Sequence, residues 1–358
     1  MASGRCSCVT WPVSLADWRF GSVGPFVTHS GGRYHSMMKS KQSAGGRITL
    51  QPPSLWGRVL VAAVQMGGTT HSVANGLGLV AAGKVVGKIA PKDVECVVRL
   101  NADTKFAFEL GDFYWNRLVS PRYVYEVDLT AILARFDKIP YTFIDGGANY
   151  GYWSVLVSSK EMGSHPAIAV EALASTHARL LKNCELNGHE IDPVHAAISD
   201  TDGDTVQITT WGKHAGSSLD SEWLTDRRGV AHVEDVTTVT VDALAARVPE
   251  GVPIVVKLDV EGSEVAAFKG SVGALERGAV LLYEDFGEDL ECRPTAHLLS
   301  VPGISIYASV AGGQMRRIRS VADAVAIKTY TKMGYNLAAT KEGSVFDRVL
   351  GSHLLPVT

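Results

Sequence analysis

The sequence predicts an α/β fold with a mostly parallel, doubly wound sheet of the Rossmann type and a small N-terminal α/β cap. From Pro140 onward, short apolar segments alternate with helical ones. These apolar segments are uniform rather than alternating, which is typical of strands buried on both faces by helices. The predicted strands are 141–145, 167–171, 193–199, 252–259 and 279–284, and the predicted helices are 152–159, 175–187, 241–248 and 264–277.

Composition supports a globular protein and limits its partners. The chain has 358 residues, of which 46% are hydrophobic and 20% charged, which excludes wholesale disorder and coiled coil. The 34 Lys and Arg residues against 37 Asp and Glu residues give a net charge of −3. The whole chain therefore lacks the positive excess that would draw it to nucleic acid or an acidic membrane, and we expect a small-molecule or glycan ligand and no nucleic acid.

The chain divides into three parts. Residues 1–54 are rich in Ser, Gly and Arg, with six basic residues and one acid, and are predicted to be a disordered tail. This tail resembles an organelle transit peptide, and the alternative is an upstream extension, since Met37 or Met38 could serve as the start. Residues 55–139 are predicted to form the cap, with a helix near Leu55, strands at 94–100 and 105–110, and a helix at 126–136, and residues 140–350 form the main domain.

Several absences bear on localisation. The five cysteines are scattered and form no CxxC pair, which fits a reduced cytosolic setting. No apolar stretch approaches the roughly 20 residues of a membrane span, so no span is predicted. We therefore expect a cytoplasmic protein, with organelle targeting by the N-terminus as the alternative.

A glycine-rich loop follows the first strand of the main domain. A dinucleotide fingerprint would need glycine at Ala148, so nicotinamide binding is disfavoured. The pattern Asp145-x-Gly147-x-Asn149-x-Gly151 instead has the form of the loop that folds around S-adenosylmethionine (SAM), where small residues let the backbone approach the cofactor. The alternative is a strand-to-helix turn that binds no ligand.

Two further acidic positions end predicted strands. Glu171 lies twenty residues beyond Gly151, where a carboxylate can accept both ribose hydroxyls, although an acid there also suits a helix N-terminus. Strand alternation places Lys257, Asp259 and Glu261 on one side of a later strand end. These three charges form either a polar rim that faces the methyl donor or a structural ion cluster.

Together these motifs resemble the FkbM-like family of SAM-dependent methyltransferases. The resemblance covers about residues 123–290 and rests on the motifs Asp145 to Gly151, Glu171, Ala197-Ile198-Ser199-Asp200, Val239 to Leu244, and Lys257 to Glu264, in the family's order. Two departures are Ala172, where the family usually has proline, and Gly146, where it usually has an apolar residue.

The resemblance implies O-methylation of a hydroxyl on a sugar, glycan or polyketide-like molecule, with SAM as cofactor. The implied cofactor-binding residues are Asp145, Gly147, Ala148, Asn149, Gly151, Glu171, Ser199 and Asp259. The implied catalytic residues are Asp259, Glu261 and Lys257, with Asp259 or Glu261 as the base that takes the hydroxyl proton. The Asp259→Asn change is then expected to lower turnover far more than SAM affinity. A divalent metal stays an open alternative.

Other functions and residues remain as alternatives. A catalytically silent SAM-fold scaffold and a nicotinamide-dependent oxidoreductase are the rival functions; a base-modifying N-methyltransferase lacks its Asn/Asp-Pro-Pro-aromatic motif here. His214 is a further candidate base, and Glu284 is expected to line the acceptor pocket or pair with Lys257. Specificity is expected in the cap, the 211–235 insertion and the segment after Phe286, all predicted to be loops or irregular.

Overall fold

A computed structural model describes residues 48–69, 77–120, 123–211, 231–310, 314–331, 333–352 and 354. The predicted tail lies almost entirely outside these residues, as does His214. Within them, no helix is both long enough and apolar enough to cross a bilayer.

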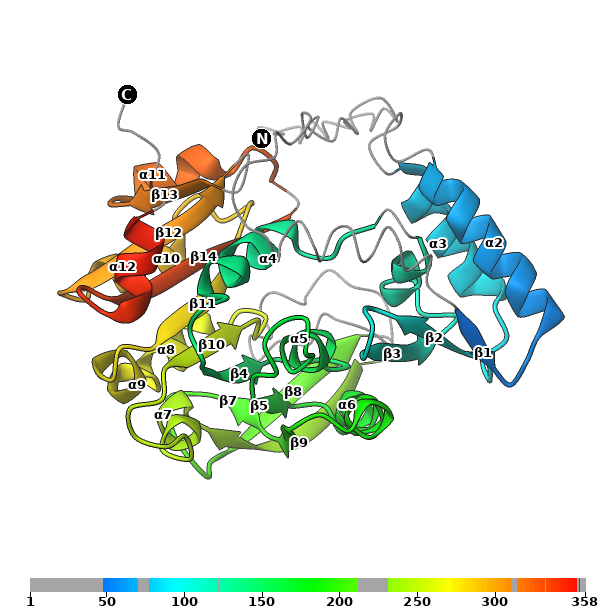
Figure 1. Ribbon diagram of the computed structural model, residues 1–358, viewed down its shortest axis with the longest axis horizontal. Helices are drawn as coiled ribbons and strands as arrows, with labels where there is room; N and C mark the ends of the chain where they lie inside the picture. Colours follow the sequence, from blue (N-terminus) through cyan, green and yellow to red (C-terminus); the bar gives the residue numbers. More distant parts are fainter. Residues whose placement is uncertain are drawn as a thin grey trace, which may run out of the picture.

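The main domain is built on one eight-stranded sheet with the order β13-β12-β14-β11-β10-β4-β5-β6 (Figure 1). Its parallel half contains β4 (Thr142–Gly146), β5 (Ala167–Glu171), β6 (Ile191–His195), β10 (Ile254–Leu258) and β11 (Val280–Phe286). The other strands, β12 (Ile304–Val310), β13 (Gln314–Ile318) and β14 (Gly334–Lys341), are antiparallel to their neighbours. The predicted α/β fold with a mostly parallel, doubly wound sheet is therefore confirmed.

Helices cover both faces of this sheet. Alternate strand residues enter two different cores: Phe143 and Val255 belong to one, and Ile144 and Val256 to the other. That arrangement explains why consecutive residues of these strands are apolar. The covering helices of the main domain are α4 (Val127–Leu133), α5 (Tyr152–Val157), α6 (Ala174–Asn187), α7 (Val241–Ala245), α8 (Glu264–Lys269), α9 (Val272–Glu276), α10 (Arg293–Leu299), α11 (Val321–Ile327) and α12 (Val345–Gly351).

Three details differ from the sequence prediction. The segment after Phe286 is regular, because β12, β13 and β14 extend the sheet, so the strand that carries Glu284 is not the last. The predicted strand 193–199 is divided between β6 and β7 (Ala197–Ile198). The predicted helix 264–277 is two helices; between them, a side chain on Gly270 would collide with the Ser199 carbonyl at 2.3 Å.

A small second sheet has the order β7-β9-β8, with β8 (Thr205–Trp211) antiparallel to β9 (Ala231–Val239). The described ends of the 211–235 insertion are therefore strand rather than loop. Residues 212–230 between them lie outside the described residues.

The N-terminal unit forms a sheet and a helical hairpin. Strands β1 (Thr49–Gln51), β2 (Glu95–Arg99) and β3 (Lys105–Glu109) pair antiparallel in that order. Helices α2 (Leu55–Thr69) and α3 (Leu77–Ile89) pack together beside the 3-10 helix η2 (Trp115–Val119). Strand β1 belongs to the segment predicted as a tail, residues 1–54. Its pairing with β2 places Thr49–Gln51 in the N-terminal unit.

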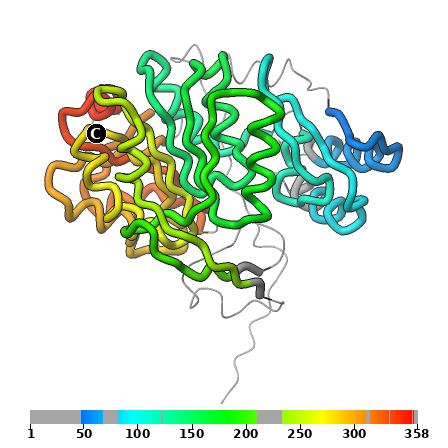
Figure 2. The backbone as a smooth tube through the Cα atoms, turned by 90° about the horizontal axis from the view of Figure 1, so that it is seen from below, coloured from blue at the N-terminus to red at the C-terminus, as the bar shows by residue number. Residues whose placement is uncertain are grey.

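The N-terminal unit and the antiparallel strands lie at opposite ends of the molecule, with the parallel strands between them (Figures 1 and 2). Side chains of α6 hold the N-terminal sheet in place. Asn183 accepts a hydrogen bond from the Ala107 amide at 2.7 Å and donates to the Ala107 carbonyl at 3.1 Å. Arg179 forms ion pairs with Glu95 and Glu109. These contacts fix the unit against the main domain.

Candidate active site

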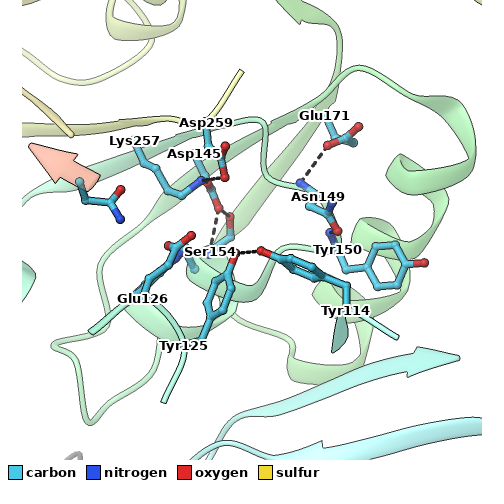
Figure 3. Close-up of polar contacts among 12 residues, drawn as sticks. Tyr114, Tyr125, Glu126, Asp145, Asn149, Tyr150, Ser154, Glu171, Lys257 and Asp259 are labelled. Atoms are coloured by element: carbon cyan, nitrogen blue, oxygen red, sulfur yellow. Dashed lines mark hydrogen bonds and ion pairs between the residues drawn. The ribbon is translucent and has the colours of Figure 1, made fainter. Parts of the chain in front are cut away.

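Asp145 ends β4 and connects the glycine loop to α5. Its Oδ2 atom accepts hydrogen bonds from the Ser154 hydroxyl at 2.6 Å and the Ser154 amide at 3.1 Å (Figure 3). Its Oδ1 atom has no hydrogen-bond partner among the described residues and lies 3.8 Å from Lys257 Nζ. Burial raises the pKa of Asp145, and the Lys257 charge and the Ser154 hydrogen bonds oppose that rise. Asp145 therefore keeps one buried oxygen unbonded.

The glycine loop approaches the end of β10 closely. Gly147 has φ 71°, and a Cβ atom there would lie 1.9 Å from the Asp259 carbonyl oxygen. Gly151 has φ 82° and begins α5. Glycine is needed at both positions because other residues rarely adopt these angles. The loop and Asp259 are thus held side by side.

Asn149 adopts a left-handed conformation at the tip of the loop, with φ 52°. Its Oδ1 atom accepts hydrogen bonds from the Tyr150 amide at 2.8 Å and from Trp115 Nε1 at 3.2 Å. Because Trp115 belongs to η2, the N-terminal unit contributes directly to the loop's conformation.

Glu171 ends β5 beside the loop, as the sequence predicts. Its carboxylate accepts hydrogen bonds from the Asn149 amide at 2.8 Å and the Leu173 amide at 3.0 Å (Figure 3). Burial raises its pKa to about 7, against the lowering effect of these hydrogen bonds. Each carboxylate oxygen retains a lone pair, so the group can still accept ribose hydroxyls.

Lys257 and Asp259 form a buried ion pair at the end of β10. Lys257 Nζ lies 3.2 Å from Asp259 Oδ2, and the Lys257 side chain is 5% exposed whereas that of Asp259 is 29% exposed. Although burial favours the neutral amine, the charges of Asp259, Asp145 and Glu126 raise the pKa of Lys257 above its usual value. Lys257 is therefore a fixed cation, and Asp259 is the partner that reaches toward solvent.

Different contacts surround three other predicted site residues, Glu261, Ala148 and Ser199. β10 ends at Leu258, and Glu261 sits in a left-handed turn with φ 47°, so strand alternation does not extend to it. The Ala148 amide donates to the Val170 carbonyl, and the residue is buried. The Ser199 amide donates to the Val239 carbonyl and its hydroxyl donates to Asp200, so neither of these bonds is made to the glycine loop.

Glu126 joins this cluster from outside the predicted motifs. It precedes α4 in a left-handed conformation with φ 42°, and its Oε2 atom accepts a hydrogen bond from Trp153 Nε1 at 2.5 Å. Burial raises its pKa to about 7, Asp259 adds to the rise, and Lys257 opposes it. The sequence shows only an acid at a helix start, which helix capping alone would explain.

Two tyrosines lie beside Glu126. The hydroxyls of Tyr114 and Tyr125 are 2.7 Å apart (Figure 3). Burial raises both pKa values well above the usual range, with Glu126 adding to the effect. These hydroxyls therefore remain neutral and can both donate and accept hydrogen bonds.

Glu284 lies on β11 opposite Asn336 of β14. Burial raises its pKa to about 9, and the charges of Asp259 and Glu126 add to the rise. Within the described residues, Lys257 forms ion pairs with Asp145 and Asp259. The alternative prediction of a direct ion pair between Glu284 and Lys257 is therefore wrong. Within the described residues, no group of three or more His, Cys, Asp or Glu side chains could hold a metal ion.

Solved structures similar to this chain include two methyltransferases. Methyltransferase FkbM from Methylobacillus flagellatus KT has 14% identity and a TM-score of 0.33, over 56% of this chain and 43% of its own. Precorrin-6y C5,15-methyltransferase from Geobacter metallireducens GS-15 has 10% identity and a TM-score of 0.31, over 59% of this chain and 86% of its own. This chain thus spans less than half the length of the first.

The family comparison agrees with the motifs. No curated protein matches the chain significantly. Residues 145–296 match the model of the methyltransferase FkbM domain, a range that begins at Asp145 and includes Glu171, Lys257 and Asp259. The resemblance to the FkbM family that the sequence predicts is therefore confirmed over residues 145–296.

Proposed function

We propose that this protein is a SAM-dependent methyltransferase that methylates a hydroxyl oxygen of a sugar, glycan or polyketide-like small molecule. The observation that supports it most is the meeting of the glycine loop, Glu171 and Asp259 within the methyltransferase domain. Backbone approach at Gly147 and a carboxylate at the end of β5 are what a SAM site requires.

The residues present fit this cofactor. Bound SAM supplies a methyl group on a positively charged sulfonium. Asp145, with its unbonded buried oxygen, and Asp259 would face the cationic part of the molecule, and Glu171 would accept the ribose hydroxyls. Gly147, Asn149 and Gly151 would form the cradle around its amino-acid portion. The bound cation would also offset the negative charge of this cluster.

Methylation of an alcohol requires a group that accepts its proton. The sequence favours Asp259 or Glu261. Asp259 forms an ion pair with Lys257 at 3.2 Å, so its carboxylate already has a cation as its partner. Glu126 is half-buried and carries a pKa of about 7, close to the value that suits a general base at neutral pH. We therefore assign proton acceptance to Glu126.

The tyrosine pair supports this assignment. A neutral hydroxyl pair beside Glu126 can hold an acceptor alcohol by hydrogen bonds on either side. Positioning of this kind can lower a barrier by ~7 to 11 kcal/mol, which is more than proton transfer alone supplies. The Tyr114 and Tyr125 hydroxyls therefore orient the acceptor, and Glu126 takes its proton.

Calorimetric titration of the purified protein with SAM, and separately with NADH, tests cofactor choice. The Glu171→Ala variant should bind SAM at least tenfold more weakly, since it loses a charge-assisted hydrogen-bond acceptor. Glu185→Ala is the matched control, because Glu185 is an exposed acid on α6. NADH binding without SAM binding would favour the oxidoreductase and contradict the proposal.

Transfer of labelled methyl from SAM to a panel of sugars, glycans and polyketide alcohols tests the reaction. Label in an alkali-stable ether supports O-methylation. Label in an amine or at carbon would contradict it. Tight SAM binding without transfer to any acceptor or to the protein would favour the silent scaffold.

A further inference from the structure

The α2–α3 hairpin lies at the opposite end of the molecule from β12 and β13 (Figure 1). Leu55, Trp56 and Val59 on α2, and Val85 and Ile89 on α3, are between 49% and 83% exposed. We call these five residues the outer apolar face. Large apolar side chains grouped on two adjacent helices usually mark a surface that binds something.

This face is separate from the one that stabilises the hairpin. Leu60, Val61 and Val64 of α2 and Val86 of α3 are buried in the core of the N-terminal unit. Each helix therefore has an inner apolar side that is packed in the core and, in addition, an outer apolar side. Packing in the core explains the inner apolar residues but not the outer ones.

The hairpin is also strongly basic. Residues 55–92 contain four basic residues and no Asp or Glu, although the whole chain has a net charge of −3. All four of these side chains are exposed: Arg58, Lys84, Lys88 and Lys92. An apolar face bordered by Lys and Arg is the pattern of helices that lie in the interface of an anionic bilayer.

The charge distribution argues against two other binding partners for the outer apolar face, a second copy of the chain and residues 1–47. A second copy of the chain, docked through the same face, would bring two basic surfaces together. Residues 1–47 carry Arg5, Arg19, Arg33, Lys39, Lys41 and Arg47 against one acid, Asp17, so they too would repel the hairpin. An anionic lipid surface satisfies both the apolar and the basic side chains.

We propose that the α2–α3 hairpin binds the protein to the surface of an anionic membrane. The outer apolar face would enter the boundary between headgroups and acyl chains, and Arg58, Lys84 and Lys88 would contact lipid phosphates and carboxylates. The helices have 15 and 13 residues, so they would lie along the surface rather than cross the bilayer. This inference does not depend on the proposed methyltransferase activity.

Sedimentation of the full chain with vesicles tests the proposal. The probes are vesicles of phosphatidylcholine alone and of phosphatidylcholine mixed with phosphatidylserine. We expect binding to the mixed vesicles, weak binding to the neutral ones, and loss of binding as salt rises through about 0.5 M. Equal binding to both vesicles, or to neither, would overturn the proposal.

Two paired variants separate the two contributions. Leu55→Glu/Val59→Glu alters the outer apolar face, and Lys84→Glu/Lys88→Glu alters the charge. Each should weaken binding to mixed vesicles by about tenfold or more. The matched controls are Val272→Glu and Lys269→Glu, which change an exposed valine and an exposed lysine on α9 and α8 and should bind as the unaltered chain does.

Measurements without vesicles identify the competing occupants. Circular dichroism should show that the variants remain folded, because all of these side chains are exposed. If light scattering showed a dimer that Leu55→Glu/Val59→Glu converts to monomer, the face would bind a second copy. If that variant lost thermal stability while Val272→Glu did not, the face would be covered by the chain itself. Either result would overturn membrane binding.

Discussion

Two regions of the candidate active site contain the same chemical group in opposite environments. Around Lys257, the carboxylates of Asp145 and Asp259 lie 3.8 and 3.2 Å from an ammonium. Beside Tyr125, the Glu126 carboxylate has an indole N–H as its hydrogen-bond donor. The first region pairs two carboxyl groups with one ammonium, and the second holds a carboxyl whose pKa is raised to about 7.

This difference indicates how the two regions divide the work. The first region, with two carboxyl groups beside one ammonium, suits attraction of a cation. A buried carboxyl that titrates near neutrality suits proton transfer. The division is tested most directly by changes that remove one region's chemistry and leave the other intact.

The largest effect is expected from Glu126→Gln. Glutamine keeps the shape of the protonated side chain but cannot accept a proton, so kcat should fall by about 10² to 10⁴. Stability should stay the same or rise, because repulsion from Asp259 and Glu284 is removed. Steady-state kinetics and thermal unfolding check both statements. Asp259→Asn is the comparison: if it lowers kcat more than Glu126→Gln does, Asp259 is the base.

Lys257→Met should have the next largest effect, this time on stability. Removing the ammonium leaves Asp145 and Asp259 without their cation, and loss of one partner of a buried pair costs about 3 to 5 kcal/mol. Chemical denaturation measures the loss. The double variant Asp145→Asn/Lys257→Met should recover part of it, since one buried charge is then gone. A double variant no more stable than Lys257→Met would show that Asp145 does not depend on Lys257.

The pH dependence of stability should distinguish the regions as well. Glu126 and Glu171 have pKa values raised from 4.5 to about 7 in the folded chain. Because the folded state holds their protons more tightly than the unfolded state, their contribution is complete below about pH 4.5 and is lost as pH rises through about 7.

Each of these two carboxyls should therefore reduce the free energy of unfolding by roughly 3 kcal/mol between those limits. Urea unfolding at several pH values measures the slope. Glu171→Gln should flatten part of it, and Glu185→Gln should not. A slope unaffected by Glu171→Gln would mean that Glu171 is ionised throughout.

Much of the fold can be predicted from the sequence, because its parallel strands are buried on both faces and contain consecutive apolar residues, such as Phe143 and Ile144 in β4 and Ile254 to Val256 in β10. The antiparallel strands at the edge of the sheet are harder to predict. Strand β14 pairs with β11 and β12, and its place in the sheet is set by these contacts with segments far away in the sequence rather than by a local pattern.

Only part of the candidate site can be predicted from the sequence, because only some of its residues have a local signal. Asp145 and Glu171 lie in the last two residues of β4 and β5, and Asp259 directly follows β10, so strand ends locate all three. Glu126 comes from the start of α4, outside the predicted strand-end motifs, and only the approach of Trp153 and the Lys257 region makes it a member of the cluster. Burial, which sets its pKa, is a property of the folded chain and has no local signal.

The smallest effect is expected from Trp153→Phe, which removes the indole N–H that donates a hydrogen bond to Glu126. The indole Nε1 donates to Glu126 Oε2 and favours its charged form, so the variant should raise the pKa of Glu126 further above 7. The rise of kcat/KM with pH, which reports the base of the free enzyme, should then move to higher pH by about one unit. Trp115→Phe is the matched control, because its indole binds Asn149 and not Glu126. An unchanged profile in Trp153→Phe would separate Glu126 from the proton transfer, and the ionisable groups around Lys257 would then have to account for the chemistry alone.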